Sequence, residues 1–290
     1  MLLSDILVYG LMNGAVYAML AIGFSLIFGS ARIINLAHTA FFMLASYAVF
    51  YFGSNLGLSP FLSIPVSIIL VVLIGVFVYY VFMEPIREHE TAVLIVTVAI
   101  ALVFQEAVLI IFGGHYRGVS SIISGYISPF GIRISYQYLL TLGVVSLALL
   151  TVWLLLMKTR LGIAIRSSAQ DREVANLMGM NVARIAAATM AISVALAAVA
   201  GVMVAPLYTL EPHMWLNPLV LVLAIVILGG LGSVKGSFIG AMILAFIEVT
   251  VVFLLPGGAF LKVAIALAIM LVILIVRPEG LFGVYLEGER

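Results

Sequence analysis

The stretch AAATMAISVALAAVAGVMVA, at positions 186–205, carries no charged residue and is long enough to cross a bilayer as one helix. The rest of the 290-residue chain has the same character, with 65% hydrophobic and 9% charged residues and a mean hydropathy of +1.33. A soluble domain carries about 25% charged residues, so these are too few to cover a solvated surface. Only helices or closed barrels satisfy their backbone in lipid. The sequence therefore predicts an all-α polytopic membrane bundle, forming a single transmembrane domain over residues 1–290.

Apolar stretches of spanning length, bounded by proline, glycine or charge, predict about nine transmembrane helices. The seventh is short and ends in a glycine-rich run, so a re-entrant segment and eight crossings remain an alternative. The nine candidates cover approximately residues 6–28, 37–53, 60–82, 91–112, 138–157, 184–208, 217–231, 238–255 and 259–276.

The positions of lysine and arginine predict which side of the membrane each connection faces, because cytoplasmic loops are enriched in these residues. Five of the 13 basic residues lie in the one long basic connection, Lys158 to Arg184. With nine crossings, alternation leaves only Arg117, Arg133 and Lys262 outside. We therefore expect an N-terminus outside the plasma (cell inner) membrane and a cytoplasmic C-terminus.

Several classes of chemistry are disfavoured. The net charge of +1 argues against an electrostatic nucleic-acid binder, and the absence of cysteine excludes thiolate metal sites. The four histidines are widely separated and lack metal-binding spacing, so no catalytic or metal site is expected. The segment Gly230–Ser237 resembles a phosphate loop, but its lysine precedes the last glycine and no buried strand leads into it. If transport is active, its energy comes from an ion gradient or from another subunit.

The basic connection KTRLGIAIRSSAQDREVANLMGMNVAR, residues 158–184, is the only polar stretch long enough to hold a helix of its own. Ser168 is a candidate cap, Asp171 lies in the first turn, and Gly179 is placed to end the helix. An apolar stripe follows from the spacing of Val174, Leu177 and Met178. Such a short amphipathic helix either docks in a groove of a soluble subunit or rests on the bilayer surface.

This connection and its following span, Arg166 to Val202, resemble the coupling segment of branched-chain amino acid ABC importer permeases of the LivH type. Four further stretches agree in the same order and extend the resemblance over most of the chain. They are GLMNGAVYAMLAIGFSLIFG (Gly10–Gly29), IINLAHTAFFMLASY (Ile33–Tyr47), GGLGSVKGSFIGA (Gly229–Ala241) and RPEGLFG (Arg277–Gly283).

The resemblance implies a transport subunit rather than an enzyme. In such importers two permease subunits form the path, here expected as a heterodimer, and two cytoplasmic ATPases supply the ATP and Mg chemistry. A soluble binding protein delivers the substrate. The implied coupling helix covers about Ser168 to Met180, with Asp171, Ala175 and Gly179 at matching positions and Arg166 just before it. Ser167 and Ser168 stand where the family often has alanines after this arginine.

Two carboxylates, Glu106 and Glu248, fall within predicted spans, where a charge costs about 2.5–3.5 kcal/mol on insertion scales. We expect both to face the bundle interior, either to meet the ammonium group of a substrate or to bind a neighbouring helix. Asn35 and His38 bracket the start of the second span, as a capping turn or as part of a broken helix lining the path. Apart from these residues, we expect no pocket rich in charge, which is compatible with an aliphatic substrate.

Glycines recur every four residues at Gly10 and Gly14 and again at Gly232, Gly236 and Gly240, a spacing that favours close helix packing. A site against the substrate is the alternative. In the outer loop, residues 113–137, tyrosines either form an interfacial aromatic belt or belong to a docking surface for a soluble partner. The belt would comprise Tyr116, Tyr126, Tyr136 and Tyr138.

The best-supported function is therefore an ATP-driven importer permease for branched-chain or other aliphatic amino acids. Related importers for urea or short amides share the pattern. A gradient-driven carrier and a membrane enzyme are alternatives from other classes, but no inverted repeat and no clustered polar site is evident in the sequence.

Overall fold

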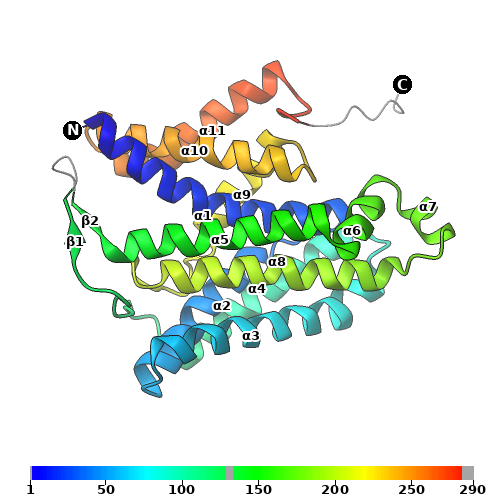
Figure 1. Cartoon of the computed structure of the whole chain (residues 1–290), viewed down its shortest axis with the longest axis horizontal. Helices are drawn as coiled ribbons and strands as arrows, with labels where there is room; N and C mark the ends of the chain where they lie inside the picture. The colour runs from blue at the N-terminus through cyan, green and yellow to red at the C-terminus, as the bar shows by residue number, and fades with distance from the viewer. Residues whose placement is uncertain (1, 129–132, 283–290) are drawn as a thin grey trace.

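The computed structural model describes residues 2–128 and 133–282, and it is a bundle of helices running roughly side by side (Figure 1). A two-stranded antiparallel hairpin, β1 (Tyr126–Ile127) and β2 (Ile134–Ser135), is the only sheet within the described residues. The predicted fold class is therefore confirmed. The helices are α1 (Leu2–Ala31), α2 (His38–Phe50), α3 (Pro60–Val78), α4 (Glu90–Phe112), α5 (Tyr136–Lys158), α6 (Arg160–Gln170), α7 (Arg172–Leu177), α8 (Val182–Val204), α9 (Leu216–Gly229), α10 (Val234–Leu254) and α11 (Gly258–Val276).

Each of the nine predicted spans corresponds to a helix, but two of the helices are short. Among the described residues, seven helices are long and apolar enough to cross a membrane: α1, α3 with its extension to Ile86, α4, α5, α8, α10 and α11. Helix α2 has 13 residues and α9 has 14, which corresponds to about 20 Å each against a hydrocarbon core of about 30 Å. The count of nine crossings stays a prediction.

The two ends of the bundle carry different structures (Figure 1). At one end, here called the hairpin end, the start of α1 lies beside the β-hairpin, and the Tyr9 hydroxyl donates to the Arg133 carbonyl at 3.3 Å. At the other, the α7 end, Arg172 donates from Nη1 to the Ala31 carbonyl at 2.8 Å. Helix α1 therefore runs the full length of the bundle.

Helix α2 is short because the chain before it turns back into the bundle in non-helical form. His38, its first residue, has Nε2 3.0 Å from the carbonyl oxygen of Leu20, which lies about 16 Å along α1 from its end at Ala31. The backbone N–H of Leu36 donates to Thr97 Oγ1, and that of Ala37 donates to Asn35 Oδ1. Irregular backbone at this depth is tolerated because it is buried in protein and hydrogen-bonded.

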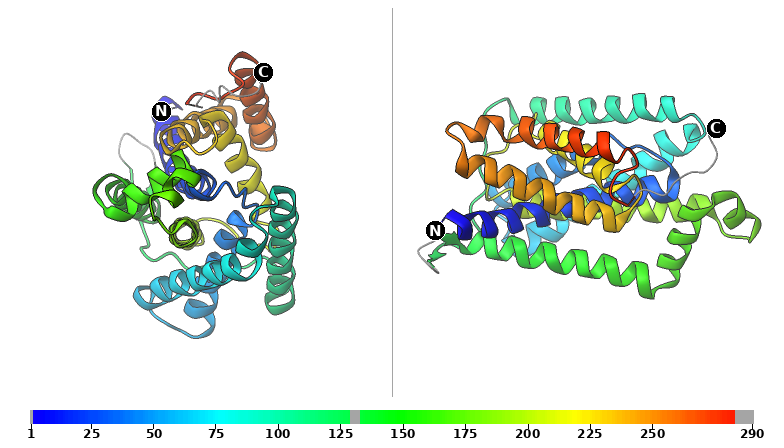
Figure 2. Two further views of the ribbon diagram at one scale, coloured as in Figure 1. Left: turned by 90° about the vertical axis from the view of Figure 1, so that its right-hand side faces the viewer. Right: turned by 90° about the horizontal axis from the view of Figure 1, so that it is seen from above.

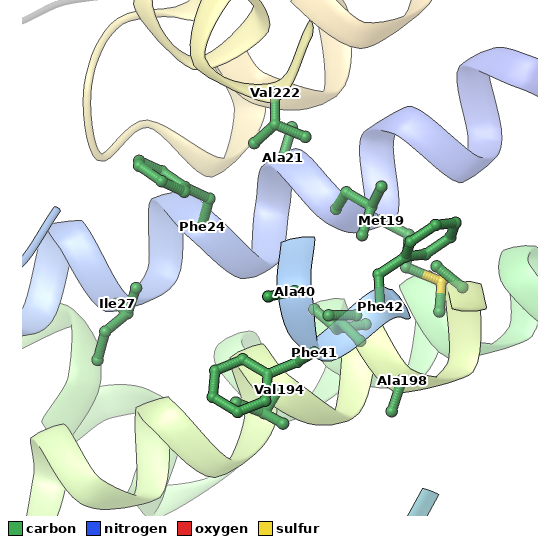
Figure 3. Close-up of a cluster of buried hydrophobic side chains, with 14 of the residues drawn as sticks. Met19, Ala21, Phe24, Ile27, Ala40, Phe41, Phe42, Val194, Ala198 and Val222 are labelled. Carbon is green, nitrogen blue, oxygen red and sulfur yellow. The ribbon is translucent and has the colours of Figure 1, made fainter. Parts of the chain in front are cut away.

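The core is formed by α1, α2, α8 and α9, whose large side chains meet at the centre (Figure 3). Phe24 of α1, Phe41 of α2, Val194 of α8 and Val222 of α9 are all fully buried there. By contrast α3 and α11 lie on opposite sides of the bundle (Figures 1 and 2) and expose large apolar side chains, Phe61 at 88% and Phe260 at 93%. This distribution suits a lipid-embedded periphery around a protein core.

Four of the five predicted packing glycines sit at close helix contacts. Gly10 and Gly14 of α1 face Phe246 and Met242 of α10, while Gly236 and Gly240 of α10 face the backbone of α9. The prediction for the fifth, Gly232, is wrong in one respect, because α10 begins only at Val234. Gly232 lies in the α9–α10 turn with φ +81°, a conformation that favours glycine, and it lies against Gly29 of α1.

The residues after α11 fold back onto the end of α9. Leu281 donates its backbone N–H to the Leu228 carbonyl at 2.8 Å, and Phe282 donates to the Gly229 carbonyl at 3.1 Å. Two terminal carbonyls of α9, which the helix itself leaves without partners, are satisfied in this way. The RPEGLFG stretch therefore closes the end of a short helix; its last residue, at position 283, lies outside the described residues.

Candidate functional site

A cavity of about 300 Å³ lies inside the bundle among α1, α5, α9, α10, α11 and the α8–α9 connection. This inner cavity is at the small end of the range for small-molecule sites. Part of its wall is aliphatic and includes Val16, Leu20 and Leu221. Polar side chains, including Asn13, Thr141, Asn217 and Tyr208, supply hydrogen-bonding groups on the rest. The inner cavity can therefore hold a small molecule with an aliphatic part and a polar part.

Glu248 of α10 supplies a buried carboxylate at the wall of the inner cavity, with 1% of the residue exposed. Its Oε2 accepts a hydrogen bond from the Tyr17 hydroxyl at 2.7 Å, and its Oε1 lies 2.8 Å from Lys262 Nζ of α11. A carboxylate inside a spanning helix needs such partners, because an unpaired charge in a low dielectric is costly. The Lys262 side chain is 39% exposed, so the pair is buried at one end only.

A second cavity, of about 420 Å³, continues from the inner one towards the hairpin end. Asp5, Tyr9 and Arg133 belong to this outer cavity and not to the inner one. Five residues line both cavities, namely Asn13, Tyr138, Tyr208, Glu248 and Lys262. The Glu248–Lys262 ion pair therefore lies on the boundary between the two.

The expectation that no pocket is rich in charge was wrong, because Lys262, Glu211 and Glu248 all border the inner cavity. Sequence reasoning had placed Lys262 only on the outer side and gave it no role. The signal that could have identified it is its position as the only charged residue of α11, near the start of a long apolar helix. A lysine there is costly unless it finds a partner or reaches the interface.

Glu106 does not face the bundle interior, and the prediction that it would is wrong. It is exposed on the surface of α4, whereas the preceding residue, Gln105, is buried and accepts a hydrogen bond from Trp215 Nε1 at 2.9 Å. Adjacent helix residues point about 100° apart, and the buried face of α4 is a narrow stripe that includes Gln105 and leaves Glu106 outside it. Gln105 also donates to Glu106 Oε1 at 3.2 Å, which gives the outward carboxylate a partner.

Asn35 and His38 are fully buried and line neither of the two cavities. Asn35 is not the cap of α2, because Ala37 occupies that position; Asn35 instead accepts from the Ala37 N–H in the turn before it. The His38 ring lies against Gly23 of α1, with Nδ1 3.2 Å from Ser193 Oγ of α8. The pair therefore joins the start of α2 to α1 and α8.

The predicted coupling helix from Ser168 to Met180 is two helices, so the single-helix prediction is wrong. Ser168 lies inside α6, where it is buried and donates to the Ser30 carbonyl at 3.3 Å, and so it cannot act as a cap. The cap is Asp171, which accepts from the Val174 N–H at 3.0 Å and starts α7. Its extended backbone, with φ −152°, breaks the helix between α6 and α7.

Helix α7 projects from the bundle (Figure 1). Apolar side chains in and just after it are exposed. Leu177 is 85% exposed and Met178 is 78% exposed, whereas Ala175 is buried against the bundle. Gly179, with φ +82°, ends the helix, and Arg166 is exposed on the neighbouring α6. These side chains form an uncovered apolar surface next to a basic helix.

Arg172 fastens α7 to the end of α1. Its guanidinium is partly buried and donates to the Ala31 carbonyl, and burial, followed by the nearby Arg87 charge, lowers its pKa. Arg87 itself is paired with Glu84 at 2.7 Å in the connection between α3 and α4. Arg172 thus joins the start of α7 directly to the end of α1.

In the outer loop, Tyr116 and Tyr126 are exposed, as either of the two predicted roles requires. Tyr138 departs from the predicted aromatic belt. Its ring packs edge-on against Tyr9, with centroids 5.9 Å apart, and it lines both cavities. An α5 residue in the first turn can point inwards as readily as outwards, and the sequence does not show which.

Within the described residues, no group of three or more His, Asp or Glu side chains could hold a metal ion. What the fold provides is a multi-pass helical membrane bundle with two adjoining cavities that share part of their lining, and this arrangement suits a membrane transport protein.

Comparison with known proteins defines the class further. Residues 6–276 match the family model described as the branched-chain amino acid transport system / permease component, so the chain belongs to this family of ABC transporter permeases. It is 30% identical to the high-affinity branched-chain amino acid transport system permease protein BraD of Pseudomonas aeruginosa, over 96% of this chain and 94% of that protein.

Two further relatives come from distant organisms. The permease protein LivH of Escherichia coli K12 is 27% identical, with 94% of this chain and 93% of that one covered. A probable branched-chain amino acid permease protein LivH of the archaeon Methanocaldococcus jannaschii is also 27% identical, over 98% and 95% of the two chains. No solved structure matches the chain.

Proposed function

We propose that this chain is the membrane-spanning permease subunit of an ATP-driven importer that carries branched-chain amino acids into the cell. The single observation that supports this most strongly is the family match over residues 6–276. The inner cavity is compatible with it, because an aliphatic side chain fits beside Val16, Leu20 and Leu221 while the polar groups of an amino acid meet Asn13, Asn217 and Glu248.

The proposal includes the partners that drive and feed the transporter. A second permease subunit completes the path, two cytoplasmic ATPases bind ATP and Mg, and a soluble binding protein delivers the substrate. The exposed apolar residues of α7, with Arg166, Asp171 and Gly179, are the proposed contact with the ATPases, whereas Ser168 and Ala175 are buried and lie outside it. In this arrangement α7 lies in the cytoplasm and the hairpin end lies outside the plasma membrane.

The test is reconstitution of the permease in vesicles with its ATPases and binding protein. Uptake of leucine, isoleucine and valine should require ATP on the side of the membrane where the ATPases lie. Unlabelled alanine should compete less well than these three amino acids. Competition by urea or short amides in place of leucine would reassign the substrate. Uptake by the isolated chain, driven by an ion gradient without ATP, would contradict the proposal and identify a secondary carrier.

A further inference from the structure

The boundary between the inner and outer cavities is formed by a charged pair that can open from one side. Glu248 lies within α10, accepts a hydrogen bond from Tyr17 and has 2% of its side chain exposed, whereas 39% of the Lys262 side chain is exposed. A pair between two fully buried charges is very costly to break, but Lys262 also borders the outer cavity, which Asp5 and Arg133 line as well, and these polar surroundings lower that cost. Lys262 can therefore leave Glu248 for another anion without losing all its stabilisation.

Helix α11, which carries Lys262, is attached to the bundle more loosely than α10. It packs mainly against α10 and α9, and only two of its 19 residues, Gly258 and Ala266, are buried. Gly257, with φ +75°, precedes it, and Gly258 is its first residue. The partner that is free to move is thus Lys262, and the fixed partner is Glu248.

We propose that an α-amino acid crosses from the outer to the inner cavity by taking the place of this ion pair. The ammonium group of the substrate binds the Glu248 carboxylate, and the substrate carboxylate binds the Lys262 ammonium. The side chain of the substrate then lies against Val16, Leu20 and Leu221 in the inner cavity. This inference rests on the proposed function. It extends that function by naming Glu248 and Lys262 as the residues that recognise the substrate.

The charge balance explains why a zwitterion is suited to this exchange. An α-amino acid carries both charges on neighbouring groups, so it can satisfy Glu248 and Lys262 together and leaves neither charge unpaired in a low dielectric. An amine, a carboxylic acid or urea supplies one charge or none, and at least one residue of the pair would lose its partner. The boundary therefore selects for the α-amino and α-carboxyl groups together.

The deciding experiment uses the complete transporter in vesicles, with [3H]leucine delivered by the binding protein. The double variant Glu248→Gln/Lys262→Met should still co-purify with the ATPases, but its leucine uptake should fall more than tenfold. A matched control, Glu106→Gln/Lys235→Met, removes a carboxylate and a lysine that line neither cavity. Its uptake should stay within twofold of the wild type.

A purely structural role for the pair predicts a different result. Removing both partners of a buried ion pair together is often close to neutral for stability, because no charge is left alone. If the pair only joined α10 to α11, the double variant would transport leucine within twofold of the wild type, and that result would overturn the proposal.

If the double variant fails to assemble, single changes at the exposed partner decide instead. Lys262→Arg keeps the cation and should retain uptake, whereas Lys262→Met should reduce it at least tenfold. Equal uptake by these two variants would overturn the proposal. If instead the proposed function itself were wrong, the wild-type complex would take up no branched-chain amino acid at all. That result differs from every outcome expected for the ion-pair proposal.

Discussion

Glu248 and Glu106 show what decides the role of a single residue. Both are carboxylates in predicted spans, and the position of each within its span indicates its depth in the membrane. Only the structure shows that Glu248 turns towards Tyr17 and Lys262 and that Glu106 points out of the bundle. Whether a helix residue points into the bundle depends on which other helices surround it. The partner of Glu248, Lys262, lies on a different helix, so the sequence of α10 alone does not identify it.

At the residue scale, the close approach of α9 and α10 predicts that Gly236 does not tolerate a side chain. A β-carbon at Gly236 would overlap the carbonyl oxygen of Gly229. Gly236→Ala should therefore lower stability by about 1–3 kcal/mol, the typical cost of overpacking. Thermal unfolding of the detergent-purified permease measures this loss.

The matched control for Gly236 is Gly143, a helical glycine of α5 with open space where a β-carbon would be. Gly143→Ala should leave stability unchanged or raise it by up to about 1 kcal/mol, because alanine has a higher helix propensity than glycine. Equal melting temperatures for the two variants would show that α9 and α10 are not in close contact.

At the scale of the element, the division between α6 and α7 separates two tasks within one cytoplasmic segment. Helix α6 begins with the cap Thr159, which accepts from the Gly162 N–H, and it carries the buried Ser168. Helix α7 carries the exposed Leu177 and is followed by the exposed Met178. Sequence reasoning located the segment and its terminating Gly179, but it missed the break, because serine and aspartate are both good caps.

The end of α7 predicts an effect on coupling to the ATPases. Gly179 has φ +82°, where a residue with a β-carbon costs about 1–2 kcal/mol, so Gly179→Leu should displace the end of the helix. We expect this variant to lose substrate-stimulated ATP hydrolysis by the complex. Gly179→Asn is the control, because asparagine tolerates this conformation, and it should retain most of the stimulation. Unchanged stimulation in the leucine variant would refute a coupling role.

At the scale of the whole molecule, the arrangement of the helices accounts for the distribution of apolar side chains. Long exposed helices surround a core built from α1, α2, α8 and α9, two of which are too short to cross the bilayer as straight helices. The segment before α2 is largely enclosed by protein, with Ile33, Asn35 and Ala37 buried, whereas the turn after α9 exposes Leu231. Irregular backbone at this depth is tolerated where protein surrounds it.

The number of crossings predicts which exposed positions face the same side. If α9 crosses the membrane, single cysteines replacing Arg166 and Lys235, both exposed in this cysteine-free chain, should be labelled from the same face. A cysteine at Tyr116 should be labelled from the opposite one. Ser30 and Ser237 are unsuitable for this measurement because both are fully buried. Labelling of the Arg166 and Lys235 positions from opposite faces would indicate a re-entrant α9 and eight crossings.

The sequence by itself determined that this protein lies in a membrane, where its helices run, and which polar residues are costly within them. These properties follow from the length and hydropathy of contiguous stretches, so neighbouring residues suffice to predict them. The tertiary structure alone decided that Glu248 meets Lys262 at a cavity, that Glu106 does not, and that α2 begins deep inside the bundle. Each of these outcomes depends on contacts between residues on different helices, which the order of residues along one helix does not specify.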